Sequence, residues 1–419
     1  MTANADTARP PAATAAAFVA TMQLSRLLAA AEYNRAMKLL DPGESAADCA
    51  LALVGAGLLT PFQGRRLLAG KSDGLVLGQY VVLDQLSDGR RERVYKARHR
   101  TMDRLVALRV YAADVTRNPA HRAVVQAEAR AAARLAHPNV LTVLDSNESG
   151  DRLYVVHEYV EAVPLAALVS ETRRRPTGRA CEVARQAALG LHHAHEMGLP
   201  HGHFHPGCLV VGRPGRDGVG ASDRVEVKVA HFGTPAGPDT DAVADPLPFR
   251  APEQRGPVGR PSVAADLYSL GAVLFYLLTG QPPAGRSPSA RAARPTLPDA
   301  VEVLLRELLS ANPTRRPLSA AEVAGRLEAF AECDDAGPGV QFELPPLDLT
   351  DAPSGGFLSG LHADDTSPWY GIEAAATLDS VPTITHAQAP APRRHGVTLA
   401  VGGAVGALVT LAAVALLGR

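Results

Sequence analysis

The chain has 419 residues, of which 46% are hydrophobic and 20% are charged, so it carries enough apolar side chains to bury a core. Its formal net charge of -1 excludes the strong basic field of a nucleic-acid-binding protein, and we expect no nucleic-acid partner. The four cysteines form no C-x-x-C pair, and the first residues lack the basic start and apolar stretch of a secretory signal. These features favour a cytoplasmic location for the bulk of the chain, with reduced thiols.

The N-terminal part of the chain divides into two segments. Residues 1–16 are rich in Ala, Pro and Thr, which predicts a disordered start. From 17 to 72 the apolar residues recur with helical spacing, beginning at Phe18 and Met22, and the stretch DPGES interrupts them. We therefore expect a small helical unit over 17–72.

Residues 78–330 contain a β-rich half followed by a helical half. Strand patterns occur in RVYKARH, LVALRVYA, VLTVLDS and RLYVVHEYV, whereas helical patterns dominate after about Leu165. Strands followed by helices in this order predict an α+β fold with two lobes.

The C-terminal part predicts a tether to a membrane. Residues 334–395 are rich in Pro, Asp, Ser and Thr without periodicity, as in a flexible linker. Residues 397–417 carry no charge and no proline, and as a helix they would extend about 31 Å, enough to cross a bilayer. Arg393 and Arg394 precede this span, which predicts a single-pass protein of the inner (cytoplasmic) membrane with its N-terminal mass in the cytoplasm. Gly402 and Gly406 make the span a candidate contact for a homodimer.

Nine motifs within residues 78–330 follow one another in a familiar order. They are LSDGRRERVYKARH, VALRV, AEARAAARLAHPNVL, LYVVHEYV, HGHFHPGCL, AHFG, FRAPEQ, ADLYSLGAVLFYLLTG and NPTRRP. In this order and at these intervals the chain resembles the bacterial, membrane-anchored serine/threonine protein kinases of the eukaryotic-like type. The resemblance implies a bilobal protein-kinase fold, with a β-rich N-lobe and a helical C-lobe.

The glycine-rich loop that the resemblance places at LSDGRRE is degenerate. Such a loop brings bare backbone close to the phosphates of ATP. Here Ser87 and Glu92 stand at two of the three glycine positions, and Arg90 and Arg91 follow the remaining Gly89. Side chains at these positions hinder a close backbone approach, and Glu92 adds a charge of the same sign as phosphate.

The strand lysine and its helix partner are changed in part. The resemblance places Arg109 at the lysine of V-A-I-K and Glu128 at the glutamate of the helix that pairs with it. A forked guanidinium directs its donors differently from an ammonium. We expect an ion pair between Arg109 and Glu128.

The remaining catalytic positions carry histidine or cysteine. By resemblance, His203 stands at the catalytic Asp, His205 at the following Lys, Cys208 at the metal-binding Asn and His231 at the Asp of D-F-G. Magnesium prefers oxygen ligands in an octahedral array, which imidazole and thiol do not supply. The sequence therefore predicts a pseudokinase, a kinase fold without phosphotransferase activity and without an expected cofactor.

Positions that hold the C-lobe together match the family. Glu253 of A-P-E and Arg316 before Pro317 predict a buried ion pair, and Asp266 of DLYSLG predicts a brace for the catalytic loop. His201 and Phe232 match members of the packed spine. Loss of catalytic residues beside a retained framework indicates a signalling scaffold or regulator. Its expected partner is another protein, for instance an active kinase or a signalling substrate.

Three alternatives use the same residues differently. His203, His205, Cys208 and His231 could bind Zn²⁺ as a sensor module, because soft ligands suit that ion. ATP could bind without Mg²⁺ in a pocket whose adenine-facing positions are Val94, Ala107, His157, Glu158, Val160 and Val210. The chain could also be an active serine/threonine kinase with relocated catalytic residues.

Overall fold

The computed structural model describes residues 14–41, 43–89, 92–165, 169, 176–212, 225–232, 247–255, 259–285 and 288–331. All of them belong to the first of the two units into which the chain divides, residues 1–371. The predicted linker at 334–395 and the predicted span at 397–417 lie outside the described residues. Among the residues described, no helix is both long and apolar enough to cross a lipid bilayer.

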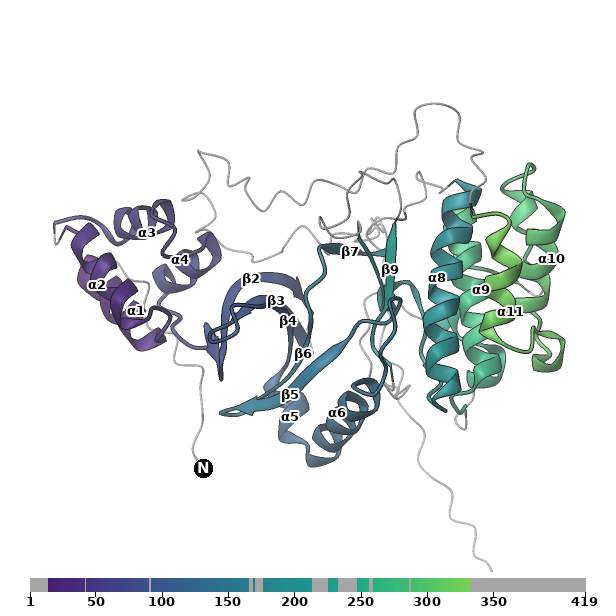
Figure 1. The fold of residues 1–419 in the computed structure, drawn as a ribbon, viewed down its shortest axis with the longest axis horizontal. Helices are drawn as coiled ribbons and strands as arrows, with labels where there is room; N and C mark the ends of the chain where they lie inside the picture. Colours follow the sequence, from purple (N-terminus) through teal and green to yellow (C-terminus); the bar gives the residue numbers. More distant parts are fainter. Residues whose placement is uncertain are drawn as a thin grey trace, which may run out of the picture. The chain divides into compact units, whose positions relative to one another are not determined.

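Four short helices precede the first strand. They are α1 (Ala15–Ser25), α2 (Ala30–Leu39), α3 (Ala46–Gly55) and α4 (Pro61–Leu68), shown in purple at the N-terminal end of Figure 1. The side chains of Thr14, Ser45 and Thr60 accept hydrogen bonds from the first turns of α1, α3 and α4, which fixes where these helices begin. Helix α1 thus starts at Ala15, two residues before the start predicted for the helical unit. Phe18 and Leu53 are fully buried in the core that the helices share.

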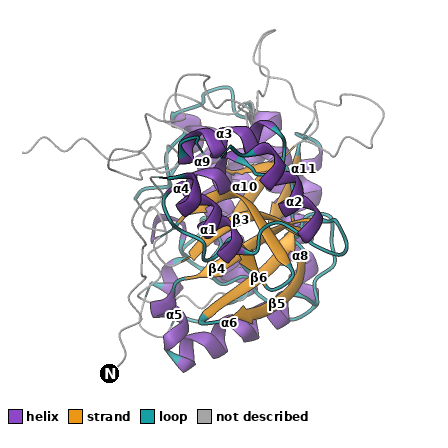
Figure 2. Ribbon diagram, turned by 90° about the vertical axis from the view of Figure 1, so that its left-hand side faces the viewer, coloured by secondary structure: helices purple, strands orange, loops and turns teal. Residues whose placement is uncertain are grey.

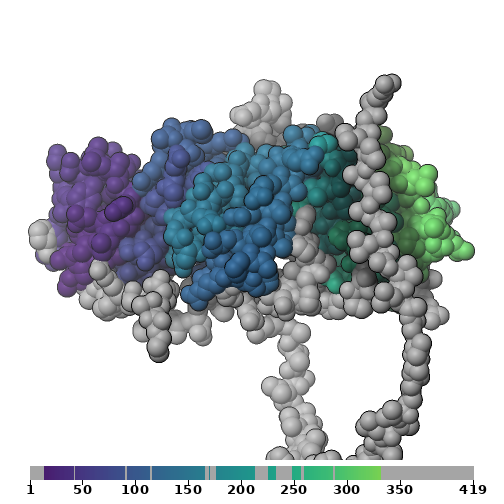
Figure 3. Space-filling view, turned by 90° about the horizontal axis from the view of Figure 1, so that it is seen from below, coloured from purple at the N-terminus to yellow at the C-terminus, as the bar shows by residue number. Residues whose placement is uncertain are grey.

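The helical unit is fastened to the sheet that follows it. Gln63 of α4 donates its side-chain amide to the carbonyl of Val82 at 2.7 Å, and the Thr60 hydroxyl donates to the carbonyl of Leu83 at 2.6 Å. The Arg100 guanidinium also donates to carbonyls at the end of α1. In the space-filling view of Figure 3, the purple surface of the helices adjoins the blue surface of the sheet. The unit therefore packs directly on the N-lobe.

The N-lobe is a six-stranded antiparallel sheet in the order β1-β2-β3-β4-β6-β5. Its strands, in chain order, are β1 (Val76–Leu77), β2 (Tyr80–Asp88), β3 (Glu92–His99), β4 (Leu105–Tyr111), β5 (Val143–Ser149) and β6 (Arg152–Glu158). Helices α5 (Ala113–Arg117) and α6 (Pro119–Ala132) come between β4 and β5, and α6 packs beside β5 (Figure 2). The four predicted strands correspond to β3, β4, β5 and β6.

The C-lobe consists mainly of helices. Its long elements are α8 (Thr177–Glu196), α9 (Val263–Thr279), α10 (Asp299–Leu308) and α11 (Ala320–Glu328), which lie side by side in Figure 1. A small sheet of β7 (Ala162–Pro164), β8 (Leu209–Gly212) and β9 (Glu226–Val229) stands where the lobes meet. Short 3-10 turns follow at Pro206–Cys208, Leu247–Phe249, Pro252–Gln254, Ala290–Ala292 and Pro313–Arg315.

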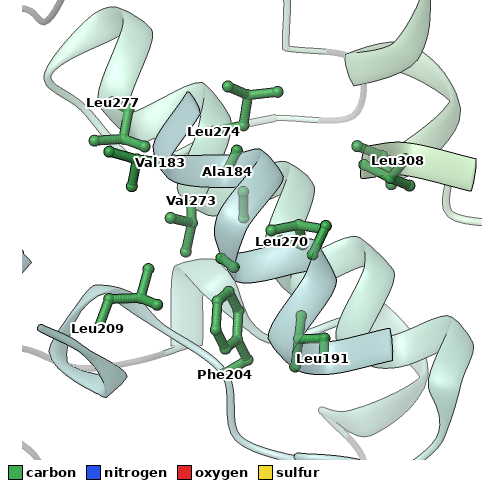
Figure 4. Packing of buried hydrophobic residues seen from close by; sticks show 14 of the residues in the cluster. Val183, Ala184, Leu191, Phe204, Leu209, Leu270, Val273, Leu274, Leu277 and Leu308 are labelled. Atoms are coloured by element: carbon green, nitrogen blue, oxygen red, sulfur yellow. The ribbon is translucent and has the colours of Figure 1, made fainter. Parts of the chain in front are cut away.

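The core of the C-lobe extends to the loop between α8 and β8. Helix α9 is apolar on nearly every face, and almost all of its residues are buried, including Leu270 and Leu274. Phe204 of the loop is 2% exposed and points toward α8 and α9, beside Leu191 and Leu270 (Figure 4). Burial of this one ring fixes the loop against the helices, because a buried aromatic side chain contributes about 2 kcal/mol.

Candidate functional site

The loop of HGHFHPGCL is held by a buried carboxylate. Asp266 of α9 accepts hydrogen bonds from the backbone N–H of His201 at 2.7 Å and of Gly202 at 2.8 Å, which confirms the predicted brace. Its Oδ2 also lies 2.8 Å from Nε2 of His195, a histidine of α8 that no sequence motif marks as functional. The His201 ring bonds the carbonyl of Ala230 and packs against the Phe232 ring at 4.9 Å. The loop therefore has one fixed conformation.

A charge pair between buried Arg316 and exposed Glu253 closes the base of the C-lobe. Arg316 donates to both carboxylate oxygens of Glu253 and to the carbonyls of Ser310 and Ala264. Its side chain is 0% exposed. Burial acts to raise the pKa of Glu253, but the hydrogen bonds from Arg316 outweigh it and hold that pKa below its usual value. The predicted Glu253–Arg316 pair is confirmed.

We call the region where β3, β4 and β6 face the HGHFHPGCL loop and His231 the interlobe site. His203 and His205 of the loop lie with their rings 5.2 Å apart, and Nδ1 of His205 accepts the N–H of Gly207. Burial lowers the pKa of His203 to about 4 and that of His205 to about 3. Cys208 is buried with its thiol 3.4 Å from the carbonyl of His203, and burial raises its pKa to about 12. These groups are therefore neutral at pH 7.

His231 lies in the same site in an unusual backbone conformation. Its φ angle is 67°, in the left-handed region that histidine enters more readily than most residues. Burial lowers its pKa well below the ordinary value, and the charge of Arg109 acts in the same direction. The ring is therefore a neutral group where the resemblance predicts a carboxylate.

The structure does not assemble the predicted zinc ligands. In the described part of the chain, no three or more His, Cys, Asp or Glu residues are arranged so that they could hold a metal ion. The Cys208 thiol is buried and directed to the carbonyl of His203. The zinc hypothesis therefore finds no formed site among these residues.

Arg109 is paired, but with a different carboxylate from the one predicted. Its Nε lies 2.6 Å and its Nη2 2.5 Å from Oε2 of Glu92, and its guanidinium stands 5.2 Å from the Tyr111 ring. Oε1 of Glu128 is buried and has no hydrogen-bond partner, and burial raises the pKa of this carboxyl to about 7. The predicted Arg109–Glu128 pair is wrong.

The strand register explains why Glu92 reaches Arg109. Val94 of β3 stands opposite Arg109 of β4, and Glu92 precedes Val94 by two residues. Residues two apart on a strand share a face, so Glu92 and Arg109 are diagonal neighbours on one side of the sheet. Glutamate at a former glycine position thus brings its carboxylate to the cation that the resemblance assigns to phosphate.

The positions predicted to face adenine lie on β3, β4 and β6, in the segment after β6, and on β8. The side chains of Val94, Ala107, Val160 and Val210 are half-buried. Ala107 and His157 are partners in neighbouring strands, and burial lowers the pKa of His157 to about 3. The Glu158 carboxylate accepts the N–H of Thr142 and lies 3.2 Å from the Lys228 ammonium. Nδ1 of His157 is buried without a partner.

A sheet-rich N-lobe, a helical C-lobe, a braced loop after α8 and a Glu253–Arg316 pair together define a protein of the protein-kinase fold. A family model described as "Protein kinase domain" matches residues 80–324. Because this match covers more than half of the chain, the chain belongs to the protein kinase domain family.

Several curated serine/threonine kinases are similar to the chain. It is 31% identical to serine/threonine-protein kinase PksC of Streptomyces coelicolor over 302 residues, covering 66% of this chain and 52% of that protein. It is 26% identical over 289 residues to serine/threonine-protein kinase PrkC of Bacillus subtilis, covering 64% and 42%. It is 30% identical over 275 residues to PknB of Mycobacterium leprae, covering 59% and 42%. The chain thus matches about half or less of the length of these relatives.

Solved structures agree with this assignment. The crystal structure of the Mycobacterium tuberculosis PknI kinase domain is 26% identical, with a TM-score of 0.50, and the match covers 62% of this chain and 98% of that domain. A double mutant of the same domain gives 25% identity and a TM-score of 0.51.

Protein kinases use magnesium-bound ATP, and the residues of the interlobe site do not fit this metal. The ligand positions hold Cys208 and His231, whose thiol and imidazole are poor partners for a hard cation. The Glu92 carboxylate is already occupied by Arg109, and the Glu128 carboxyl is buried. No catalytic step through magnesium follows from these residues.

Proposed function

We propose that this chain is a membrane-tethered pseudokinase, which binds another protein as a signalling scaffold or regulator and does not transfer phosphate. The observation that carries the proposal is that buried histidine and cysteine side chains, which supply no oxygen ligand for Mg²⁺, occupy the catalytic positions of a kinase fold. A kinase needs its metal ions and positioned cations to neutralise charge on the transferring phosphoryl group.

The position of the catalytic base supports the proposal. A general base works best when its pKa lies near the working pH. The pKa of His203 lies near 4, and its Nδ1 already stands 3.3 Å from the Arg250 guanidinium, which can only donate. His203 is therefore poorly suited to remove the proton of a substrate hydroxyl.

The occupied cation supports the proposal in a second way. Arg109 stands where a kinase lysine contacts the phosphates, and Glu92 holds it with two short contacts. The triphosphate of ATP would have to displace this internal carboxylate. The Arg109–Glu92 pair therefore lowers the affinity of the site for ATP without Mg²⁺.

Location and partners are part of the same proposal. The uncharged span at 397–417 would hold the chain at the cytoplasmic face of the inner membrane, and the 334–395 segment would link it to the kinase-like domain. The partner is a protein, an active kinase or a signalling substrate, and the span gives a candidate contact for homodimers.

Phosphate transfer tests this proposal. The full chain in detergent is incubated with radiolabelled ATP and Mg²⁺ or Mn²⁺, alone and with a mixed serine/threonine peptide library. We expect no label above that of a heat-inactivated sample. The variants His203→Ala and His231→Ala are the controls. Label that appears in the wild type and is lost in either variant would show an active kinase and overturn the proposal.

A further inference from the structure

His203 of the interlobe site lies beside Arg250, and each side chain carries a donor without a partner. Nη2 of Arg250 lies 3.3 Å from Nδ1 of His203. Because a guanidinium has no acceptor, Nδ1 must accept, and the neutral ring then carries its hydrogen on Nε2. Nε2 of His203 and Nε of Arg250 are both buried and have no hydrogen-bond partner. The pair thus offers two N–H groups that nothing in the protein satisfies.

The charge at this position is also uncompensated. No carboxylate lies within ion-pair distance of Arg250 in the described part of the chain, although buried cations are normally paired. Its backbone is fixed, because Arg255 donates to the Arg250 carbonyl at 3.1 Å and Gln254 donates to the carbonyl of Gly202 at 3.2 Å. The guanidinium therefore belongs to a rigid segment that is joined to the HGHFHPGCL loop.

At the position of His203, hydrogen-bond donors stand where an active kinase has an acceptor. In a kinase, the carboxylate at this loop position accepts the proton of the substrate hydroxyl. His203 and Arg250 instead present one positive charge and two N–H donors, which complement an anion. Both residues are half-buried and keep some exposed surface, whereas the two unpartnered nitrogens are themselves buried, so an anion reaches these nitrogens only when nearby side chains move.

We propose that His203 and Arg250 form a receptor for one anionic side chain, a phosphate or a carboxylate, of a partner polypeptide. This inference rests on the proposed function, since it names the chemistry by which the inactive domain recognises its protein partner. A hydroxyl is a poor ligand for the pair, because it brings no charge to Arg250 and would satisfy only part of the donor set. A phosphoserine or a glutamate at the same place pairs with both groups.

Degenerate peptide libraries with one fixed central residue test the receptor. Four libraries carry phosphoserine, phosphothreonine, glutamate or serine at the centre and are passed over the immobilised full chain in detergent micelles. We expect at least one anionic library to be retained tenfold or more over the serine library. Comparison of the phosphorylated libraries with the glutamate library identifies the source of the charge. Equal retention of serine and of every anionic residue by the wild type overturns the proposal.

Matched variants separate the receptor from general attraction to basic surface. Arg250→Gln removes the charge at the receptor and should abolish the preference for anions, whereas Arg260→Gln removes an exposed charge elsewhere in the C-lobe and should keep it. His203→Asp restores an acceptor and should reverse the preference toward serine. If Arg260→Gln loses as much as Arg250→Gln, or if His203→Asp keeps the anion preference, the proposal fails.

The two proposals fail in different ways. Incubation of the full chain with the serine library, ATP and Mg²⁺ in solution reports phosphate transfer, and transfer would overturn the pseudokinase. Absence of transfer together with absence of anion preference would overturn the receptor alone. Thermal melting of each variant confirms that it is folded before its retention is compared.

Discussion

Polar groups at the base of the C-lobe have hydrogen-bond partners, whereas several buried polar groups in the interlobe site have none. The Arg316 guanidinium donates to Glu253, and the Asp266 side chain accepts hydrogen bonds from the backbone of the HGHFHPGCL loop. In the interlobe site, Nδ1 of His157, Nε2 of His203 and Oε1 of Glu128 are buried without partners. Unpaired burial disfavours charge, so it lowers the pKa of His157 and of His203 and raises the pKa of Glu128.

This difference indicates which interactions maintain the fold. Breaking a buried pair leaves an isolated charge, at a cost of about 3–5 kcal/mol, whereas neutral replacements in the interlobe site impose a smaller cost. A chain can therefore lose the residues of phosphate transfer and keep the kinase architecture. The predictions below test the two halves of this comparison.

The largest expected effect is at the base of the C-lobe. Glu253→Gln leaves the Arg316 charge buried, and we expect a loss of about 3 kcal/mol in the free energy of unfolding, measured by urea denaturation. The control is Arg326→Ala, which breaks a pair with Glu307 whose side chains are 33% and 37% exposed and should cost less than about 1 kcal/mol. Equal losses of unfolding free energy in the two variants would contradict the stronger role assigned to the Glu253–Arg316 pair.

A smaller, pH-dependent effect is expected from His157. Its pKa is about 3 in the folded chain and about 6.5 in the unfolded chain, so the unfolded state binds the extra proton between these values and stability falls as pH falls. From pH 7 to pH 5 this amounts to about 2 kcal/mol. His157→Leu should remove that part of the pH dependence, as measured by thermal unfolding at both pH values. His121→Leu, on an exposed part of α6, should leave the slope unchanged.

The Arg109–Glu92 pair should control access of nucleotide. Glu92→Ala combined with Glu128→Gln removes both carboxylates near Arg109, and we expect metal-free ATP to bind at least tenfold more tightly, which corresponds to about 1.4 kcal/mol. Calorimetric titration in EDTA gives the dissociation constants. Asp88→Ala is the control, because it breaks the neighbouring pair with Arg93. An equal gain in that control would contradict a masking role for Glu92.

The smallest effect on stability is expected where the N-terminal helices contact the sheet. Gln63→Ala removes the hydrogen bond to the Val82 carbonyl and leaves a buried acceptor, so we expect a loss of about 1 kcal/mol. Limited proteolysis should then cleave faster between α4 and β2. Gln79→Ala, a change in the turn between β1 and β2, should not alter the cleavage rate. Unchanged proteolysis of the Gln63→Ala variant would show that this bond does not hold the unit on the sheet.

Much of the framework could be predicted from sequence because it depends on local pattern and on motif order. The strands of the N-lobe follow from alternating apolar residues, and Glu253, Asp266 and Arg316 follow from motifs whose partners are fixed by the fold. The four N-terminal helices follow from helical spacing, and only their boundaries required the side-chain caps of Thr14, Ser45 and Thr60.

The contacts inside the interlobe site could not be predicted in the same way. Whether Arg109 meets Glu92 or Glu128 depends on where α6 packs against the sheet, which no short motif specifies. The strand pairing did contain a usable signal, since Glu92 shares a face with Val94, the residue opposite Arg109. The approach of Arg250 to His203 joins residues 47 apart in the chain and needed the structure.

The most direct test of the account measures the effect of Mg²⁺ on nucleotide binding. The full chain is titrated with ATP in EDTA and in excess Mg²⁺, and the two dissociation constants are compared. Because Cys208 and His231 offer no oxygen to the metal, we predict that Mg²⁺ does not strengthen binding. An increase in affinity of tenfold or more with Mg²⁺ would show that the site holds the metal and would contradict the account.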